Sequence, residues 1–295
     1  MSRPALSVVI ATTHPWPSAR ECLEILAPQC QAAEAELLLG DSTGEGLPDP
    51  PPDWLADVRH VVSPGASIFD LRAKCTEIAQ GEIIAWTEDH CHPAIDWCAR
   101  ILEAHREQPD ALAIGGAVSN GSTANAMDWA NFLCTFAPFL PPLDRSRIGR
   151  VPAAANISFK RSALPPAPIA PGGIELTLEA DLWSQRKIGF DDRIRVTHVQ
   201  SWGFWGTPRA HFHNGRSTTG LRAGNMTLAR RLRRMLICGV LPLEILRTAL
   251  MPLIGKPNVP LRCLPLIAGL AVAHSAGEFT GLLLGGAGAS PLKLE

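Results

Sequence analysis

The sequence lacks several features that would place it quickly in a class of proteins. Its 27 Lys and Arg residues nearly balance 28 Asp and Glu residues, for a formal net charge of −1. No overall positive field therefore attracts nucleic acid. Its eight cysteines include no C-x-x-C pair, which indicates reduced, mostly buried thiols of a cytosolic protein. No internal repeat is apparent either.

Two kinds of membrane segment are also missing in clean form. The first residues, "MSRPALSVVIATTHPW", lack the long apolar core and cleavage site of a signal peptide, so residues 6–12 are predicted to form a first strand. Near the other end, "LPLIAGLAVAHSAGEFTGLLLG" is interrupted by His274 and Glu278, whereas a clean transmembrane helix needs about 20 uninterrupted apolar residues. The 295 residues have room for one domain of about 200 to 250 residues and an appendage.

What is present is an alternation of strand and helix patterns. The apolar run "LSVVIAT" is typical of a strand buried on both faces. Ser18 with Glu21 predicts a capping box, and Ser67 predicts a helix N-cap. The predicted strands are 6–12, 35–41, 58–63 and 82–87, and the predicted helices are 18–26, 67–81 and 94–108. This order predicts right-handed β-α-β units around a mostly parallel sheet.

Polar residues lie at the carboxyl ends of three of these predicted strands. They are Thr12 and Thr13, then Asp41, then the triplet at 88–90. In open parallel sheets ligands bind beyond the carboxyl ends of the strands. We therefore expect these residues to converge on one ligand site.

The pattern changes beyond residue 111. Residues 111–118, 150–160 and 192–200 are strand-like, and a loop-rich segment separates the first two. Residues 164–173 are rich in Pro and Gly and predict a loop, and residues 176–189 predict a helix that ends at Gly189.

The stretch "TEDHCHP" holds the densest cluster of ionisable residues. It is either the polar end of a buried strand or a functional site. A zinc hydrolase site built from His90, Cys91 and His92 is one alternative, in which alternation along a strand puts the two histidines on one face and Cys91 on the other. No other Cys/His cluster at ligand spacing supports it.

Several motifs, in order, resemble those of the family 2 glycosyltransferases of GT-A fold. "GEIIAWTEDHCHP" is similar to the family's apolar run and acidic triplet, with Glu88, Asp89 and His90 at the three positions that are usually aspartate. "LRAKCTEIAQGE" resembles its Arg-Asn helix, with Arg72 kept and Ala73 in the Asn place. The resemblance covers roughly residues 6–205.

Three further motifs extend this resemblance. "ELLLGDSTG" resembles the strand whose aspartate contacts the nucleotide base, here Asp41. "LEADLW" resembles the family's Glu-Asp-x-Asp-Leu motif and puts Glu179 at the catalytic-base position, with Asp181 beside it. "VTHVQ" puts His198 where a late histidine approaches the metal and the diphosphate.

The resemblance implies an α/β fold with a GT-A-like, Rossmann-type, mostly parallel sheet and flanking helices. The apolar sequence that follows predicts a C-terminal hydrophobic helical region. The resemblance also implies an inverting hexosyltransferase that moves a sugar from a UDP- or GDP-sugar to a hydroxyl acceptor. The implied roles are catalysis by Glu179 and Asp181, donor binding by Thr12, Thr13, Asp41, Arg72, Glu88 and Asp89, and metal binding by Glu88, His90 and His198.

His90 in the triplet leaves the metal open. An imidazole ligand favours Mn²⁺ over Mg²⁺, but a protonated His90 with Arg72 nearby would instead stabilise the diphosphate directly. A catalytically inactive nucleotide-binding or scaffold protein, and a metal-dependent hydrolase, remain the alternative functions.

Each site residue also has a purely structural interpretation. Asp41 in "DSTG" is typical of a turn, Arg72 of an exposed helix position, His198 of a hydrogen-bonded strand histidine, and Glu179 with Asp181 of a solvated helix face. The tryptophans Trp183, Trp202 and Trp205 are predicted to be core residues rather than platforms for sugar stacking.

The last third is locally cationic, with ten basic residues against Glu244 alone between Arg209 and Arg262. We expect residues 1–208 to form the catalytic domain and 209–295 a basic, then hydrophobic helical region. Its helices are predicted to lie at the cytoplasmic face of the membrane, with arginines on anionic headgroups, which would suit a saccharide or lipid-linked acceptor of cell-envelope polysaccharide synthesis. A helical pair packed on the catalytic domain and a dimer interface are the alternatives.

Overall fold

The computed structural model describes residues 3–48, 50–144, 148, 151–178, 182, 185–224, 226–250 and 260–285. The chain divides into two compact units. The first, here called the sheet unit, comprises Met1–Ser119 and Phe139–Val199, and the second, the helical unit, comprises Asn120–Pro138 and Gln200–Glu295. The boundary expected at residue 208 falls inside a continuous helix, α6 (Gly203–Ala223).

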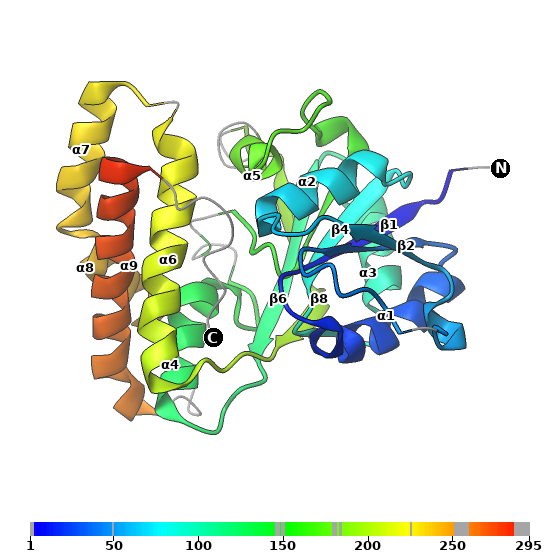
Figure 1. Ribbon diagram of the computed structural model, residues 1–295, viewed down its shortest axis with the longest axis horizontal. Helices are drawn as coiled ribbons and strands as arrows, with labels where there is room; N and C mark the ends of the chain where they lie inside the picture. Colours follow the sequence, from blue (N-terminus) through cyan, green and yellow to red (C-terminus); the bar gives the residue numbers. More distant parts are fainter. Residues whose placement is uncertain are drawn as a thin grey trace. The chain divides into compact units, whose positions relative to one another are not determined.

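The first half of the sheet is parallel, as the β-α-β pattern predicts. Its strands are β1 (Leu6–Thr12), β2 (Glu36–Asp41), β3 (Val58–Val62) and β4 (Ile83–Glu88). They lie in the order β3-β2-β1-β4, and every residue of β1 is buried. The register pairs Thr12 with Asp41 and Ala11 with Glu88, so the polar strand ends lie at one edge of the sheet. Figure 1 shows β1, β2 and β4 in this sheet.

Strand pairs in the second half of the sheet are antiparallel, so the sheet is mixed rather than mostly parallel. It contains β5 (Cys91–Pro93), β6 (Ala113–Asn120), β7 (Ile157–Lys160) and β8 (Ile188–His198), and the full order is β3-β2-β1-β4-β7-β6-β8-β5. β7 is antiparallel to both β4 and β6, and β5 is antiparallel to β8.

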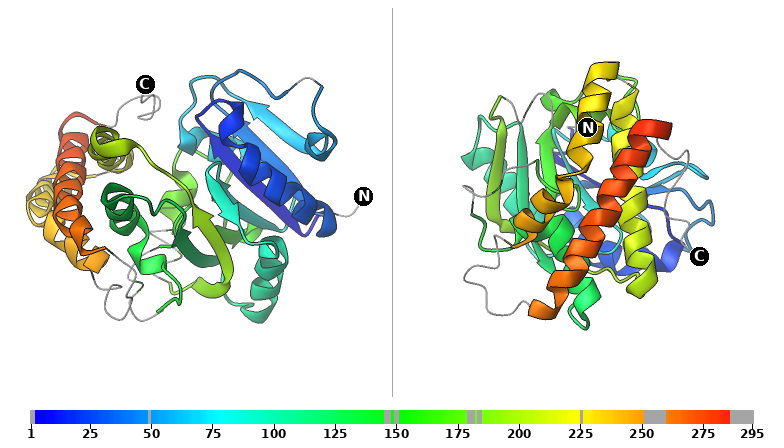
Figure 2. Two further views of the ribbon diagram at one scale, coloured as in Figure 1. Left: turned by 90° about the horizontal axis from the view of Figure 1, so that it is seen from below. Right: turned by 90° about the vertical axis from the view of Figure 1, so that its left-hand side faces the viewer.

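Helices cover both faces of this sheet, as the ribbon views show (Figure 2). They are α1 (Arg20–Ala32), α2 (Ile68–Ile78), α3 (Trp97–Glu107) and the short α5 (Gly173–Thr177). Short 3₁₀ helices lie at Trp16–Ser18, Asp53–Leu55 and Arg161–Ala163. Ser67 caps α2 in a reciprocal capping box with Asp70. The capping box predicted at Ser18 is wrong, because Ser18 ends a 3₁₀ turn and α1 begins after Ala19 without a side-chain cap.

Two further expectations need correction. The segment predicted to be loop-rich contains the helix α4 (Ala126–Phe136), whose N-cap Asn125 accepts a hydrogen bond from the amide of Asp128. The helix predicted to end at Gly189 does not reach it, because β8 already begins at Ile188.

The core of the sheet unit lies between α2, the sheet and α5. Trp86 of β4 is fully buried there, with its ring edge-on to Phe159 of β7 at 5.0 Å and its Nε1 donating to Thr76 Oγ1 at 3.2 Å. Ile174 of α5 and Leu38 of β2 belong to the same cluster. The core therefore links both halves of the sheet beneath the edge that carries the polar residues.

Asn156, just before β7, ties the antiparallel half together. Its side-chain amide donates to the carbonyls of Ala117 at 2.8 Å and Ile194 at 3.0 Å, and its Oδ1 accepts from Trp97 Nε1 at 2.9 Å. All three bonds are buried. Gly116 makes this approach possible, because a Cβ there would overlap both the Ile194 carbonyl and the Asn156 amide.

The helical unit contains α4, α6, α7 (Leu228–Cys238), α8 (Leu241–Leu250) and α9 (Leu264–Leu284). α9 runs alongside α6 (Figures 1 and 2). Gly277 and Gly281 of α9 face the carbonyls of Phe212 and Arg216, with no room for a Cβ. This close approach fixes the pair by backbone contact.

One described helical segment, Leu261–Leu284, is long and apolar enough to cross a membrane by length and composition. A little under half of an apolar stretch of 18 residues within it is buried inside the structure. Core helices of soluble proteins can have the same length and composition, so these two properties alone do not establish a membrane span.

A buried histidine should make the sheet unit sensitive to acid. His105 of α3 bonds Ser158 Oγ at 3.0 Å, and burial, with a smaller effect from Lys160, lowers its pKa to about 4. The imidazole takes up a proton near pH 6.5 in the unfolded chain but only near pH 4 in the folded chain. The free energy of unfolding is therefore unaffected by this difference above pH 6.5. It falls as the pH drops toward 4, by up to about 3 kcal/mol. Thermal melts at pH 7.5 and 5 should therefore differ more for the wild type than for His105→Gln. Equal differences would contradict this prediction.

Candidate functional site

A tight turn between two strands presents the central residues of the site. β4 ends at Glu88, Asp89 and His90 form the turn, and β5 begins at Cys91. β5 pairs with β8 so that Cys91 lies opposite His198, and the amide of Val199 donates to the carbonyl of His90 at 3.0 Å. This pairing places His198, which is 108 residues after His90 in the sequence, beside the turn.

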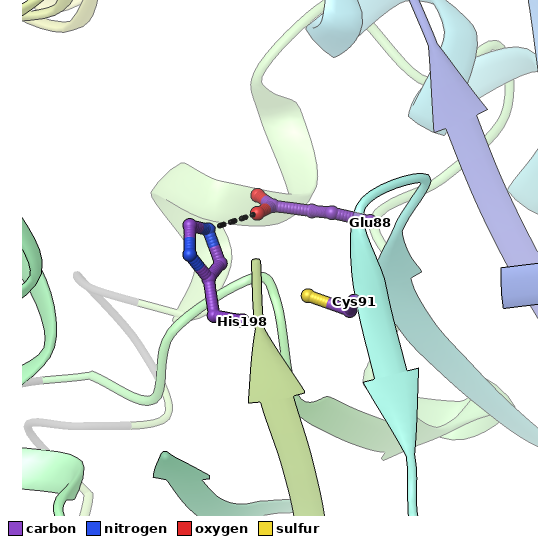
Figure 3. Close-up of side chains that lie close together, drawn as sticks. All are labelled: Glu88, Cys91 and His198. Carbon is purple, nitrogen blue, oxygen red and sulfur yellow. Dashed lines mark ion pairs between the residues drawn. The ribbon is translucent and has the colours of Figure 1, made fainter. Parts of the chain in front are cut away.

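Three side chains meet at this point. Glu88 Oε2 lies 3.4 Å from His90 Nε2 and 3.4 Å from His198 Nε2, and the two Nε2 atoms are 2.9 Å apart. The carboxylate of Glu88 points toward the His198 ring (Figure 3). The structure thus brings together the three residues that the sequence predicts as metal ligands.

The protonation of the two histidines differs. Burial lowers the pKa of His90, but the carboxylates of Asp89 and Glu88 outweigh it and raise the pKa to about 10. Burial lowers the pKa of His198, the charge on His90 adds to this, and Glu88 only partly opposes it. The carboxylates therefore favour the protonated form of His90, whereas burial favours the neutral form of His198.

Asp89 faces away from these three ligand atoms and holds their surroundings in place. Its Oδ1 binds His90 Nδ1 at 2.6 Å, and its Oδ2 accepts from Thr12 Oγ1 at 2.6 Å and lies 3.1 Å from His14 Nδ1. Burial raises the pKa of Asp89, but the bonds from His14, His90 and Thr12 outweigh it and lower the pKa. The anion fixes the ring of His90 so that Nε2 points at Glu88 and His198.

Arg72 of α2 pairs with Glu88 and adds to the effect of the two histidines on its ionisation. It is buried, not exposed as its structural interpretation supposed, and its guanidinium lies 5.3 Å from the centre of the Trp86 ring. Its Nη2 donates to Glu88 Oε1 at 3.1 Å, and its Nη1 lies 3.6 Å from Glu175 Oε1. Burial raises the pKa of Glu88, but His198, His90 and Arg72 lower it well below its usual range.

Asp41 and Thr13 lie at the same edge of the sheet. Asp41 Oδ1 accepts from the amide and the hydroxyl of Thr43, each at 2.7 Å, and its Oδ2 lies 3.2 Å from His60 Nε2. The turn interpretation of Asp41 is therefore correct, and its contact with a nucleotide stays a prediction. Thr13 is half-buried directly after β1.

The donor atoms fit a divalent cation. Ligand atoms about 2.1 Å from one ion are roughly 3.0 to 3.4 Å apart in octahedral or tetrahedral geometry, which agrees with the separations around Glu88, His90 and His198. Two imidazoles and a carboxylate suit Mn²⁺ better than Mg²⁺.

Cys91 extends the possible ligand set. Glu88, Cys91 and His198 each offer an atom within 4.8 Å of the others, and Figure 3 shows the thiol beside the two side chains. Burial raises the pKa of Cys91 well above its usual value, so the protonated thiol is a weaker ligand than the imidazole of His90. The cluster His90, Cys91 and His92 does not form, because His92 Nε2 binds Glu21 at 3.0 Å.

Other predicted residues lie elsewhere or outside the described part of the chain. Glu179, Asp181 and Trp183 are not among the described residues. Trp205 belongs to the helical unit and is 83% exposed, so the prediction that it is a core residue is wrong. It touches Phe204 edge-on at 5.0 Å, whereas Trp202 is half-buried.

Sequence reasoning missed His14. It follows the two threonines after β1, and its Nδ1 lies 3.1 Å from Asp89. Its place in the polar run after the first strand was the available signal, since it shares the sheet edge with the triplet.

Comparisons with known proteins identify the fold. No protein-family model matches the sequence, and no curated protein matches it. Among solved structures, one of GalNAc-T7 with UDP, GalNAc and Mn²⁺ is 17% identical with a TM-score of 0.50, over 67% of this chain and 43% of that chain. The chain thus spans less than half the length of that relative.

A mannosyltransferase from Pyrobaculum calidifontis, in complex with GDP-Man and Mn²⁺, is 15% identical with a TM-score of 0.50. That likeness covers 94% of this chain and 87% of the mannosyltransferase. The chain therefore has the fold of GT-A glycosyltransferases.

A measurement of cation binding distinguishes the ligand set that contains His90 from the one that contains Cys91, since Glu88 and His198 belong to both. Titration calorimetry with MnCl₂ should show binding that Glu88→Gln and His198→Gln each weaken at least about 100-fold, since each removes a direct ligand. His90→Gln should weaken it similarly, and Cys91→Ser should leave it within about twofold. His92→Gln is the matched control, because His92 binds Glu21 instead. A loss in Cys91→Ser with none in His90→Gln would contradict the set that contains His90.

Proposed function

We propose that this protein transfers a sugar from a nucleoside diphosphate donor to a hydroxyl acceptor. The observation that carries the proposal is the convergence of Glu88, His90 and His198 within 3.4 Å at the edge of a GT-A sheet. The complexes of the two similar structures with UDP or GDP-Man and Mn²⁺ support a donor of this class.

The leaving group of such a donor is a nucleoside diphosphate, whose departure is assisted by positive charge near its β-phosphate. Glu88, His90 and His198 would hold a divalent cation, which would supply that charge when bound. Arg72 orients Glu88 through the bond at 3.1 Å and, with His198 and His90, keeps it ionised. Asp89 orients His90 from behind through the bond at 2.6 Å.

The donor would lie along the strand ends that adjoin the turn. Thr12 and Asp41 are paired in register at the ends of β1 and β2, and Thr13 follows directly. We assign nucleotide contacts to these three residues. The hydrogen bonds that already fix Thr12 and Asp41 make this part of the site rigid before the donor arrives, which lowers the entropic cost of binding.

The acceptor hydroxyl needs a base that removes its proton as its oxygen attacks the anomeric carbon. We assign this role to Glu179, with Asp181 nearby in sequence, on the motif "LEADLW" alone. Direct attack opposite the departing diphosphate inverts the anomeric configuration. In this scheme the proton moves to Glu179, and the diphosphate leaves as the anion.

A metal-dependent hydrolase is the second candidate. The approach of Cys91 to Glu88 and His198 favours it, because a thiolate ligand would select zinc. The two functions differ in their products, since only the transferase joins the sugar to an acceptor other than water.

The test is a panel of UDP- and GDP-sugars with Mn²⁺ and mixed sugar acceptors, read by product mass and released nucleoside diphosphate. Glu179→Gln should lower kcat about 10²- to 10⁴-fold and leave donor binding nearly unchanged. His198→Gln should lower donor turnover, and His92→Gln should not. Turnover that is equal in wild type and Glu179→Gln would refute the assigned base, and failure of every donor to bind would refute the function.

A further inference from the structure

α7 has its apolar side turned outward. In a helix on the surface of a soluble protein, the apolar stripe normally faces the core. In α7 the leucines at 228, 232 and 236 are 72%, 54% and 80% exposed. They recur at every fourth position and so follow one side of the helix. We call this side, together with the exposed Arg233 at its border and the exposed Arg230 farther round the helix, the outer face of α7.

Two other arginines hold the helix in this orientation. Arg231 donates to the backbone carbonyls of Leu282 and Leu283 at the end of α9, the latter at 3.0 Å. Arg234 Nη2 lies 3.2 Å from Glu278 Oε2. A cation at the carboxyl end of a helix is favoured by its dipole. α7 is therefore packed on α9 through Arg231 and Arg234 and through Met235 and Cys238, which lie in one apolar cluster with Leu282. The three leucines are left more than half exposed.

Glu278 anchors this arrangement from the other side. Its Oε1 lies 3.5 Å from His274 Nε2 while Oε2 meets Arg234. Burial raises the pKa of Glu278, but His274 and Arg234 outweigh it and lower the pKa. The charge that interrupts the apolar sequence of α9 thus serves to hold α7 in place.

The charge beside the leucines identifies what covers them. The guanidinium groups of Arg230 and Arg233 are exposed, and neither has an ion-pair partner among the residues that the structure describes. The eleven residues of α7 include four arginines and no acid. An exposed apolar row with one exposed cation at its border and a second on the polar side of the helix matches the boundary of a bilayer with anionic headgroups.

We propose that the outer face of α7 docks the protein on an anionic lipid surface, with Leu228, Leu232 and Leu236 in the acyl boundary and Arg230 and Arg233 on headgroup phosphates. α7 lies in the interface and α9 does not span it. α9 packs along α6, on which Arg209 and Asn214 are exposed, and immersion of that pair in lipid would strand those polar groups.

Flotation of the full chain with vesicles tests this directly and uses no sugar donor, so its result is independent of the proposed transfer. The protein should float with vesicles of phosphatidylcholine and phosphatidylglycerol and much less with phosphatidylcholine alone. Leu232→Gln/Leu236→Gln should weaken binding at least about tenfold. Arg230→Gln/Arg233→Gln should weaken it about tenfold and reduce its dependence on salt.

Matched controls come from the sheet unit. Ile78→Gln/Ile95→Gln removes two exposed aliphatic side chains there, and Arg20→Gln/Arg106→Gln removes two exposed charges. Both should float like the wild type. Circular dichroism and melting temperature should be unchanged in the α7 variants, because the altered side chains are exposed.

Three outcomes would overturn the proposal. They are no flotation with either vesicle, flotation that the α7 variants do not weaken, and a dimer by light scattering that Leu232→Gln/Leu236→Gln dissociates without any vesicle binding. The last would assign the outer face to a second copy of the chain.

Discussion

The burial of two adjacent carboxylates is the constraint on which the site depends. Glu88 and Asp89 lie where a strand ends and reverses, and an uncompensated anion there would cost several kcal/mol. Arg72 and the two histidines offset Glu88, while Thr12, His14 and His90 surround Asp89. These partners come from β1, the segment after it, α2, the turn and β8. The charge balance of one turn therefore requires that both halves of the sheet be in place.

His90 has a double part in this balance. It is the ligand-like imidazole nearest to His198 and the cation that pairs with both carboxylates. A divalent ion in the same place would supply the positive charge in its stead, and His90 would release its proton as it became a ligand. The two interpretations of His90 that the sequence leaves open would then describe one site with and without a bound ion. Arg72 stays in place in both, because Trp86 and Glu175 hold it from the other side.

Much of the fold could be predicted because its signals are local. The parallel strands are apolar runs that end at polar residues, and Ser67 is an N-cap residue that marks the start of α2. The antiparallel half could not be read in this way, because β5 has three residues and β7 four, and their pairing is set by distant partners. In the site, the motif order indicated Glu88, His90 and His198. His14 could be found only from its distance to Asp89, which is far away in sequence. The burial of Arg72 likewise depends on contacts with residues distant in the chain.

Asn156 shows how closely the antiparallel half is coupled. Its three buried bonds reach partners 38, 39 and 59 residues away, on β8, β6 and α3. Losing any one of these elements leaves a buried amide unsatisfied, so partial opening is penalised at every step. This part of the sheet should then behave as a single cooperative unit, in which no strand frays by itself. Since β8 also carries His198, the edge that holds the candidate site shares the stability of that unit.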